Sequence, residues 1–445
     1  MAELLYGSTR GGETGVTASQ AVLKGLADDG GLYVPERIPT LDVTMDELAG
    51  MTYQETAYAV MKQFLTDYTE EELKYCISRA YDEKFDTEEI APLAKADGMY
   101  FLELFHGKTI AFKDMALSIL PYLMTTAAKK NHAKNEIVIL TATSGDTGKA
   151  AMAGFADVPG TRIIVFYPKN GVSRVQELQM LTQKGANTSV VGIEGNFDDA
   201  QTGVKRLFSD EALREELDKR GFFFSSANSI NWGRLVPQIV YYFAAYAQLL
   251  KAGQIALGDA VDFCVPTGNF GDILAGYYAK QMGLPVGKLV CASNENNVLT
   301  DFLTTGTYTA RRVFYKTTSP SMDILVSSNL ERLLYHVTGS DTEVASLMKQ
   351  LNETGSYTVR PETLAAIQES FACGWSSEAQ VAGEIRARYE QDHYLCDTHT
   401  AVAFHVAAQH KRDGVPMVVL STASPFKFPR SVLTALGQSA PENDF

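Results

Sequence analysis

The sequence predicts an α/β protein in which two lobes built on parallel sheets accompany a mostly helical N-terminal region. From about residue 96 onward, short apolar runs alternate with longer amphipathic runs, and strands that alternate with helices form parallel sheets with right-handed crossovers. The chain has 445 residues, which is too long for one ordinary domain. We therefore expect an N-terminal domain over residues 1–95, one lobe over 96–260 and a second, partly helical lobe over 261–445, with the two lobes interleaved.

Two amphipathic helices are predicted in the N-terminal domain. Residues 48–65 and 69–81 carry apolar side chains at the spacing of one helix face. Thr69 is followed three residues later by Glu72, a capping-box pattern that satisfies free amides at the start of a helix. The second helix is therefore expected to begin directly after Thr69.

Strands and helices alternate in the two lobes. The predicted strands are 137–141, 163–167, 189–193, 261–265, 289–292 and 417–421. The predicted helices are 149–155, 173–184, 197–209 and 272–282. The apolar run 235–250 predicts a buried core helix, and residues 321–390 have a helical pattern.

Composition excludes several classes of function. Hydrophobic residues make up 45% and charged residues 21% of the chain, and the net charge is −14, so neither nucleic acid nor an anionic membrane surface is an expected partner. The run 235–250 is shorter than the ~20 residues of a membrane span. The N-terminus lacks a basic segment followed by an apolar run, and the five cysteines include no CxxC pair. We expect a cytoplasmic protein with reduced thiols.

Two glycine-rich turns could bind anions. TATSGDTG (141–148) and PTGNFG (266–271) each follow a predicted strand and open a predicted helix. Amides at a helix N-terminus are unpaired and the helix dipole favours negative charge there, while glycine permits close approach. Two such turns indicate two anionic groups, one on a cofactor and one on a substrate, although each turn could also be an ordinary strand-to-helix connection.

Neither turn matches a nucleotide signature. The first is too short for a P-loop and lacks Ser or Thr after Lys149, and the second is not GxGxxG. The spacing therefore argues against an NTPase or a dinucleotide-dependent dehydrogenase.

Lys113 is a candidate nucleophile. It lies between Ala111, Phe112 and Met115 at the start of an apolar run, where partial desolvation would favour the uncharged amine that a Schiff base requires. The alternative is a solvated lysine at a helix end, paired with Asp114.

The remaining polar clusters give weaker signals. The segment SSANSIN (225–231), followed by Trp-Gly-Arg234, is rich in amides and hydroxyls and could bind a ligand or simply cap the core helix. His399, His405 and His410 are six and five residues apart, which is not the spacing of helical metal ligands. We expect no metal site.

Taken in order, several segments resemble threonine synthase, in the longer form of that family with an extra N-terminal domain. They are ELFHGKTIAFKD, TATSGDTGKAA, SANSINWGRLVPQIVYYF and PTGNFGDILAGYYAK, together with the N-terminal STRGGETG, the later SPSMDI and STASPFKF. The resemblance implies lobes of the tryptophan synthase β-like kind, known as fold type II, with pyridoxal 5′-phosphate as cofactor. It also implies a monomer that acts on O-phospho-L-homoserine.

The resemblance implies a role for each matched position. Lys113, next to Phe112, would carry the cofactor as a Schiff base. The cofactor phosphate would bind at Gly268, Asn269, Phe270, Gly271 and Asp272, and Thr422 would face the pyridine nitrogen. The substrate carboxylate would bind at Thr143, Ser144, Gly145, Asp146, Thr147 and Gly148. The substrate phosphate would bind among Lys169, Ser173, Ser226, Asn228, Ser229, Asn231 and Arg234.

The implied reaction converts O-phospho-L-homoserine and water into L-threonine and phosphate, by γ-elimination and β-addition of water, as the last step of threonine biosynthesis. Two alternatives remain open at this point, a related fold-type-II dehydratase or phospho-lyase and a catalytically silent phosphate-binding protein. One departure from the family is visible, because Ser424 stands where the family often has histidine. This change puts any role of that histidine in doubt.

Overall fold

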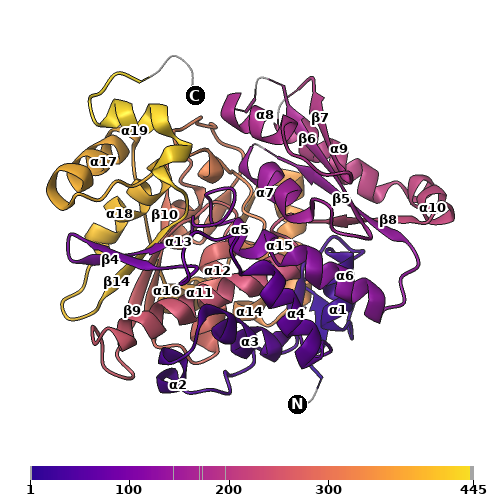
Figure 1. Ribbon diagram of the computed structural model, residues 1–445, viewed down its shortest axis with the longest axis horizontal. Helices are drawn as coiled ribbons and strands as arrows, with labels where there is room; N and C mark the ends of the chain where they lie inside the picture. Colours follow the sequence, from indigo (N-terminus) through magenta and orange to yellow (C-terminus); the bar gives the residue numbers. More distant parts are fainter. Residues whose placement is uncertain (1–2, 144, 170, 173, 196, 441–445) are drawn as a thin grey trace.

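Two parallel sheets organise the computed structural model, which describes residues 3–143, 145–169, 171–172, 174–195 and 197–440 (Figure 1). One sheet has four strands in the order β7-β6-β5-β8, and the other has six in the order β13-β10-β9-β14-β4-β3. Helices pack between and around the sheets. The predicted α/β class with two parallel-sheet lobes is confirmed.

The four-stranded sheet is parallel throughout. Its strands are β5 (Glu136–Ala142), β6 (Thr161–Pro168), β7 (Thr188–Ile193) and β8 (Phe222–Ser226). The helices that connect them are α7 (Asp146–Phe155), α8 (Arg174–Leu181), α9 (Phe197–Ser209) and α10 (Glu211–Lys219). The sequence does not predict β8, because its three phenylalanines lead straight into a polar run that we interpreted as a loop.

The six-stranded sheet is parallel except at the β3–β4 edge, where the two strands are antiparallel. Its strands are β3 (Leu93–Ala96), β4 (Met99–Glu103), β9 (Val261–Pro266), β10 (Val286–Ser293), β13 (Phe371–Trp375) and β14 (Met417–Ser421). Its helices include α12 (Gly271–Gln281), α13 (Val298–Thr305), α17 (Glu378–Asp392), α18 (Thr398–His410) and α19 (Pro429–Ala435). The chain thus enters this sheet early, crosses to the four-stranded sheet and then returns.

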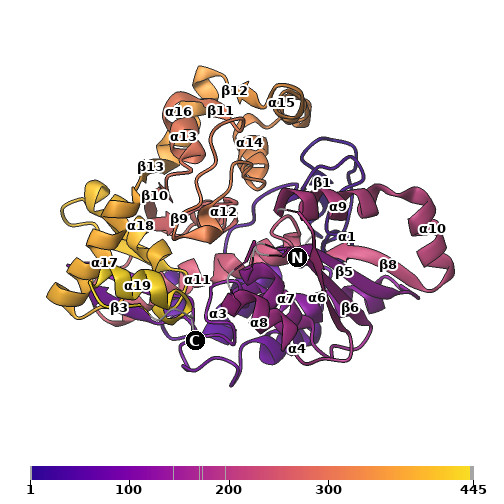
Figure 2. The same ribbon diagram turned by 90° about the horizontal axis from the view of Figure 1, so that it is seen from above.

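The segment 321–390 is not wholly helical, which corrects the prediction. It contains α14 (Leu330–Thr338), α15 (Asp341–Thr354) and α16 (Pro361–Ser370), but also the strands β12 (Ser356–Thr358) and β13. β12 pairs with β11 (Thr307–Thr309), and both lie beside these helices at the top of Figure 2. Both missed strands are short, and periodicity is not detectable over three to five residues.

The N-terminal region contributes small elements that pack onto the lobes. They are β1 (Tyr6–Ser8), α1 (Ala18–Lys24), β2 (Tyr33–Pro35), α2 (Met45–Ala49), α3 (Tyr53–Phe64) and α4 (Glu70–Ala80). The helix predicted over 48–65 is divided into α2 and α3, because Gly50 ends the first and the Thr52–Glu55 capping box begins the second. The capping box predicted at Thr69 and Glu72 is confirmed.

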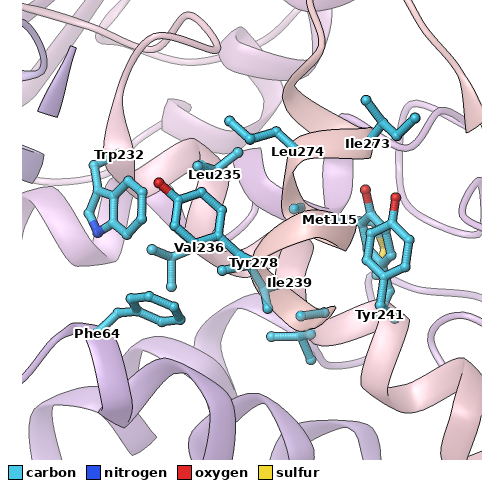
Figure 3. Close-up of a cluster of buried hydrophobic side chains, with 14 of the residues drawn as sticks. Phe64, Met115, Trp232, Leu235, Val236, Ile239, Tyr241, Ile273, Leu274 and Tyr278 are labelled. Carbon is cyan, nitrogen blue, oxygen red and sulfur yellow. The ribbon is translucent and has the colours of Figure 1, made fainter. Parts of the chain in front are cut away.

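Helix α11 (Trp232–Lys251) is the buried core helix that the sequence predicts. Its first residue, Trp232, packs against Phe64 of α3 at a ring distance of 5.6 Å and against Tyr278 of α12 at 5.4 Å (Figure 3). The helix therefore joins the N-terminal region to the six-stranded lobe. Among the described residues, no helix has both the length and the apolar character needed to cross a membrane.

Candidate active site

Lys113 lies where two distant segments of the chain meet, directly before α5 (Asp114–Leu117) and α6 (Leu120–Lys130). The backbone N–H of Phe112 donates to the carbonyl of Thr422 at 2.8 Å, and that of Ser424 donates to the carbonyl of Ile110 at 3.0 Å. These two bonds fix the Lys113 segment against the loop that follows β14.

The Lys113 amine is buried among polar groups. Its side chain is 12% exposed, and its Nζ donates to Ser321 Oγ at 3.3 Å and lies 4.0 Å from Oδ2 of Asp146. Burial lowers the pKa of Lys113 to about 8, although the Asp146 carboxylate acts in the opposite direction. At pH 7 the uncharged fraction therefore rises to about one in ten, from roughly one in three thousand for an ordinary lysine. The amine is available as a nucleophile or base near neutral pH.

Asp146, the first residue of α7, bonds to side chains from three other parts of the chain. Lys427 Nζ lies 3.3 Å from Oδ1, Gln176 Nε2 donates to Oδ1 at 3.1 Å, and Ser321 Oγ donates to Oδ2 at 3.3 Å. Burial alone would raise the pKa of Asp146, but the charges of Lys427 and Lys113 hold it below its ordinary value. The carboxylate is therefore ionised at neutral pH.

The turn between β5 and α7 is fixed by the hydroxyl of Thr143. This Oγ1 accepts hydrogen bonds from the backbone N–H groups of Gly145 and Gly148, both at 2.9 Å. Gly145 has φ +137°, and a Cβ there would lie 2.3 Å from the Gln176 side chain. Both the conformation and the space therefore require glycine.

The turn between β9 and α12 begins the helix without a side-chain cap. Phe270 has φ +65° and its side chain is buried, while a Cβ at Gly268 would lie 2.8 Å from the carbonyl oxygen of Ser321. This turn thus lies against the same residue that contacts Lys113. Asn269 belongs to the turn, and its carbonyl accepts from Asn329 N–H at 3.1 Å.

Gly271 and Asp272 form the first turn of α12. Asp272 is buried, and burial raises its pKa to about 7. Its Oδ1 accepts the Ile273 N–H at 2.9 Å, so the carboxylate occupies part of the helix N-terminus.

Asn231, predicted to bind a substrate, is occupied with the fold. Its Nδ2 donates to the carbonyls of Val22 and Ser226, and its Oδ1 accepts the Gly233 N–H at 2.8 Å. It therefore caps α11 and fastens that helix to the N-terminal region. The Ser229 carbonyl accepts from Asn329 Nδ2 at 3.2 Å, which places the Ser229 backbone next to the β9–α12 turn.

Arg234 is a buried cation with few partners. Its Nη1 donates to the Ala227 carbonyl at 2.6 Å, its Nε has no partner among the residues that the structure describes, and burial lowers its pKa to about 10. The Asn228 Oδ1 is also buried and has no partner within the described part of the chain, while the Asn228 N–H donates to Ser226 Oγ at 3.1 Å. Since a buried charge without a counter-ion is costly, this region has the chemistry of an anion site.

The other predicted residues lie elsewhere or outside the described residues. Lys169 is at the surface, where its Nζ pairs with Glu194 Oε1 at 2.8 Å and its side chain is 51% exposed. Thr147 is half-buried in α7. Ser144 and Ser173 lie outside the described residues.

The sequence did not identify four residues that the structure brings to the site, namely Ser321, Asp397, His399 and Lys427. His399 Nδ1 and Asp397 Oδ2 are 2.7 Å apart, and the Ser321 N–H donates to His399 Nε2 at 3.2 Å. From the sequence, His399 is compared only with the spacing of metal ligands. The aspartate two residues before it, Asp397, is the sequence feature that could have indicated a hydrogen-bonded histidine. Ser424, which stands where the family often has histidine, caps the helix η2 (Pro425–Lys427), because its Oγ accepts the Phe426 N–H.

A small cavity of about 10 Å³ lies at this point, roughly the room needed for one water molecule. Its lining residues are Ala111, Phe112, Lys113, Asp146, Ser321, His399, Thr422 and Ala423. A buried amine, a nearby hydroxyl and the N-terminus of α12 fit the aldehyde, ring and phosphate of pyridoxal phosphate.

Fold and site together define a pyridoxal-phosphate-dependent enzyme, and comparison with known proteins agrees. Residues 85–375 match the family model described as pyridoxal-phosphate dependent enzyme. Residues 5–81 match the model for the threonine synthase N terminus, and residues 400–444 match that for the threonine synthase C-terminal part. The chain belongs to the threonine synthase family.

Individual relatives support this assignment. A threonine synthase from Pseudomonas aeruginosa is 40% identical over 98% of this chain and 91% of its own length. The crystal structure of PLP-bound threonine synthase from Brucella melitensis has a TM-score of 0.90 and 40% identity, covering 98% of this chain and 92% of that one. Threonine synthase-like 1 from Pongo abelii is 41% identical over 94% of this chain, but the chain spans only 58% of that protein's length.

Proposed function

We propose that the chain is a threonine synthase that converts O-phospho-L-homoserine and water into L-threonine and phosphate. The observation that carries the proposal is the Lys113 amine, whose pKa burial lowers to about 8, beside the β9–α12 turn and Thr422. Buried Arg234, which has no carboxylate partner among the described residues, adds a place for the phosphate of the substrate.

The proposed cofactor site is formed by Lys113, Thr422 and the β9–α12 turn. Lys113 would hold the cofactor aldehyde, and the turn from Gly268 to Asp272 would bind its phosphate through backbone amides. Thr422 would offer its hydroxyl to the pyridine nitrogen. Pyridoxal phosphate supplies an electron sink that stabilises negative charge on the substrate carbons.

The protein's own groups would bind the substrate and move its protons. The turn that Thr143 fixes would receive the substrate carboxylate, and Arg234 with Ser226, Asn228 and Ser229 would bind its phosphate. The released Lys113 amine would take a proton at the α carbon and return it where the product needs one. Closure of the segments around the small cavity would exclude water other than the reacting molecule.

We also propose that the protein works in the cytoplasm as a monomer. The dispersed cysteines support the first point. The likeness to the longer form of the family supports the second.

A related fold-type-II dehydratase or phospho-lyase is the second candidate, because such an enzyme would share Lys113 and the β9–α12 turn. The test is to incubate the cofactor-loaded protein with O-phospho-L-homoserine and to quantify both phosphate and the amino-acid product. We expect equal amounts of phosphate and L-threonine, and no product from Lys113→Ala. Phosphate with 2-oxobutyrate and no threonine would establish the lyase instead, and unchanged turnover by Lys113→Ala would refute the role of Lys113.

A further inference from the structure

A second buried lysine, Lys427, lies at the same site as Lys113. It is the last residue of η2, which follows the loop after β14, and its side chain is only 2% exposed. Its Nζ donates to the Thr109 carbonyl at 2.7 Å and lies 3.3 Å from Asp146 Oδ1. Two buried lysines therefore face one carboxylate.

Asp146 faces each lysine with a different oxygen. Its Oδ1 lies 3.3 Å from Lys427, whereas its Oδ2 lies 4.0 Å from Lys113 and accepts a hydrogen bond from Ser321. Attraction between charges grows as their distance falls and is strong where water is excluded. The carboxylate is therefore bound more closely by Lys427 than by Lys113.

Other elements place further charges around Lys113. Asp146 of α7 raises its pKa, Lys427 of η2 and Arg234 of α11 lower it by repulsion, and Asp272 of α12 raises it. The surroundings are thus mixed in sign. Burial lowers the pKa of Lys113 most, and the Asp146 carboxylate is the strongest of the groups that oppose this shift.

The groups that face Lys427 and Asp146 do not replace this contact. Asp114 of α5 is tied to Thr109, whose backbone N–H and hydroxyl donate to it at 2.7 and 2.8 Å. Lys149 of α7 donates to Gln183 Oε1 at 2.6 Å. His399 of α18 has its Nδ1 2.7 Å from Asp397 Oδ2.

We propose that Lys427 is a positioning residue for Lys113, because it holds the Asp146 carboxylate and so keeps it from pairing fully with the Lys113 amine. Without Lys427, Asp146 closes on Lys113 and stabilises the ammonium form, which is not nucleophilic. The proposal extends the proposed function, and it rests on that function for the catalytic role of the Lys113 amine. The contacts themselves do not depend on which reaction follows.

The test measures the ionisation of Lys113 directly, without substrate or cofactor. The full-length chain, freed of cofactor, is labelled with trace acetic anhydride between pH 6 and 11, and the acetylation of Lys113 is quantified by peptide mass spectrometry. Wild type should show a midpoint near 8. Lys427→Met should raise the midpoint by about one unit, a roughly tenfold slower reaction at pH 7, whereas Asp146→Asn should lower it.

Two controls separate positioning from damage to the fold. Lys427→Arg keeps the charge and should restore a midpoint close to that of wild type. Because Lys427 acts through Asp146, Lys427→Met should shift the midpoint severalfold less in an Asp146→Asn background. An unchanged or lower midpoint in Lys427→Met, or an equal shift in both backgrounds, would overturn the proposal.

If Lys427→Met does not fold, as judged by circular dichroism, Lys427→Arg and Asp146→Asn decide the question. A wild-type midpoint in Asp146→Asn, or a midpoint raised by one unit in Lys427→Arg, would overturn the proposal. Failure of the threonine assay would leave this result untouched, so the two claims can fail separately.

Discussion

Lys113 and Arg234 are both buried cations, but their surroundings differ. Lys113 has the Asp146 carboxylate 4.0 Å away, whereas Arg234 donates only to a backbone carbonyl and its Nε has no partner among the described residues. Leaving a charge buried without a counter-ion costs several kcal/mol. Such a group is typical of a binding site, so we expect an anionic substrate to supply the counter-ion of Arg234.

Replacing Arg234 tests this expectation. A hydrogen bond to a charged group contributes ~1.5–3 kcal/mol, so Arg234→Ala should raise KM for O-phospho-L-homoserine roughly tenfold to a hundredfold. Steady-state kinetics and a cofactor titration measure the two affinities, and cofactor binding should change much less. Arg234→Lys keeps the charge but not the planar donor group, so its KM should lie between those of wild type and Arg234→Ala. Weaker cofactor binding with an unchanged KM would show that Arg234 binds the phosphate of the cofactor and not that of the substrate.

At the scale of secondary-structure elements, the two glycine-rich turns are held in different ways. The β5–α7 turn depends on one hydroxyl, since Thr143 Oγ1 accepts two backbone N–H groups. The β9–α12 turn depends on the left-handed conformation of Phe270, whose ring is buried. The first turn is therefore the one that a single polar substitution should loosen.

We predict that Thr143→Val destabilises the β5–α7 turn. It replaces the hydroxyl by a methyl group of similar size and leaves two buried N–H groups without an acceptor, which costs ~1–3 kcal/mol for each such group. Urea unfolding should show a lower free energy of unfolding, and KM for the substrate should rise. Thr143→Ser retains the hydroxyl and should stay close to wild type in both measurements. Equal stability of the valine variant would show that the hydroxyl does not hold the turn.

Periodicity and capping signals predict the elements well where these signals are long. The helix over 197–209 has the predicted bounds, and the capping box at Thr69 lies at the expected residue. β8 and β13 were missed because each has only five residues and no alternation. Both are edge strands, and each pairs with a strand that is remote in sequence: β8 with β5, and β13 with β10.

At the scale of the whole molecule, the site exists because His399 of α18 and four other remote segments converge. The Lys113 segment, the β5–α7 turn, Ser321 and the loop after β14 meet around a cavity of about 10 Å³. The sequence could nominate Lys113 from its apolar neighbours and the two turns from their glycines. It did not nominate Lys427, which lies between Phe426 and Phe428, because apolar neighbours alone do not show burial, and Phe426 itself is 80% exposed. Its 2% exposure follows from packing alone.

The central claim is that these segments converge to place the cofactor on Lys113. The most direct measurement is to load the protein with pyridoxal phosphate, reduce it with borohydride and map the modified lysine by mass spectrometry. We predict one pyridoxyl group per chain, attached to Lys113. Attachment at Lys427 or at any other lysine, with Lys113 unmodified, would contradict the account.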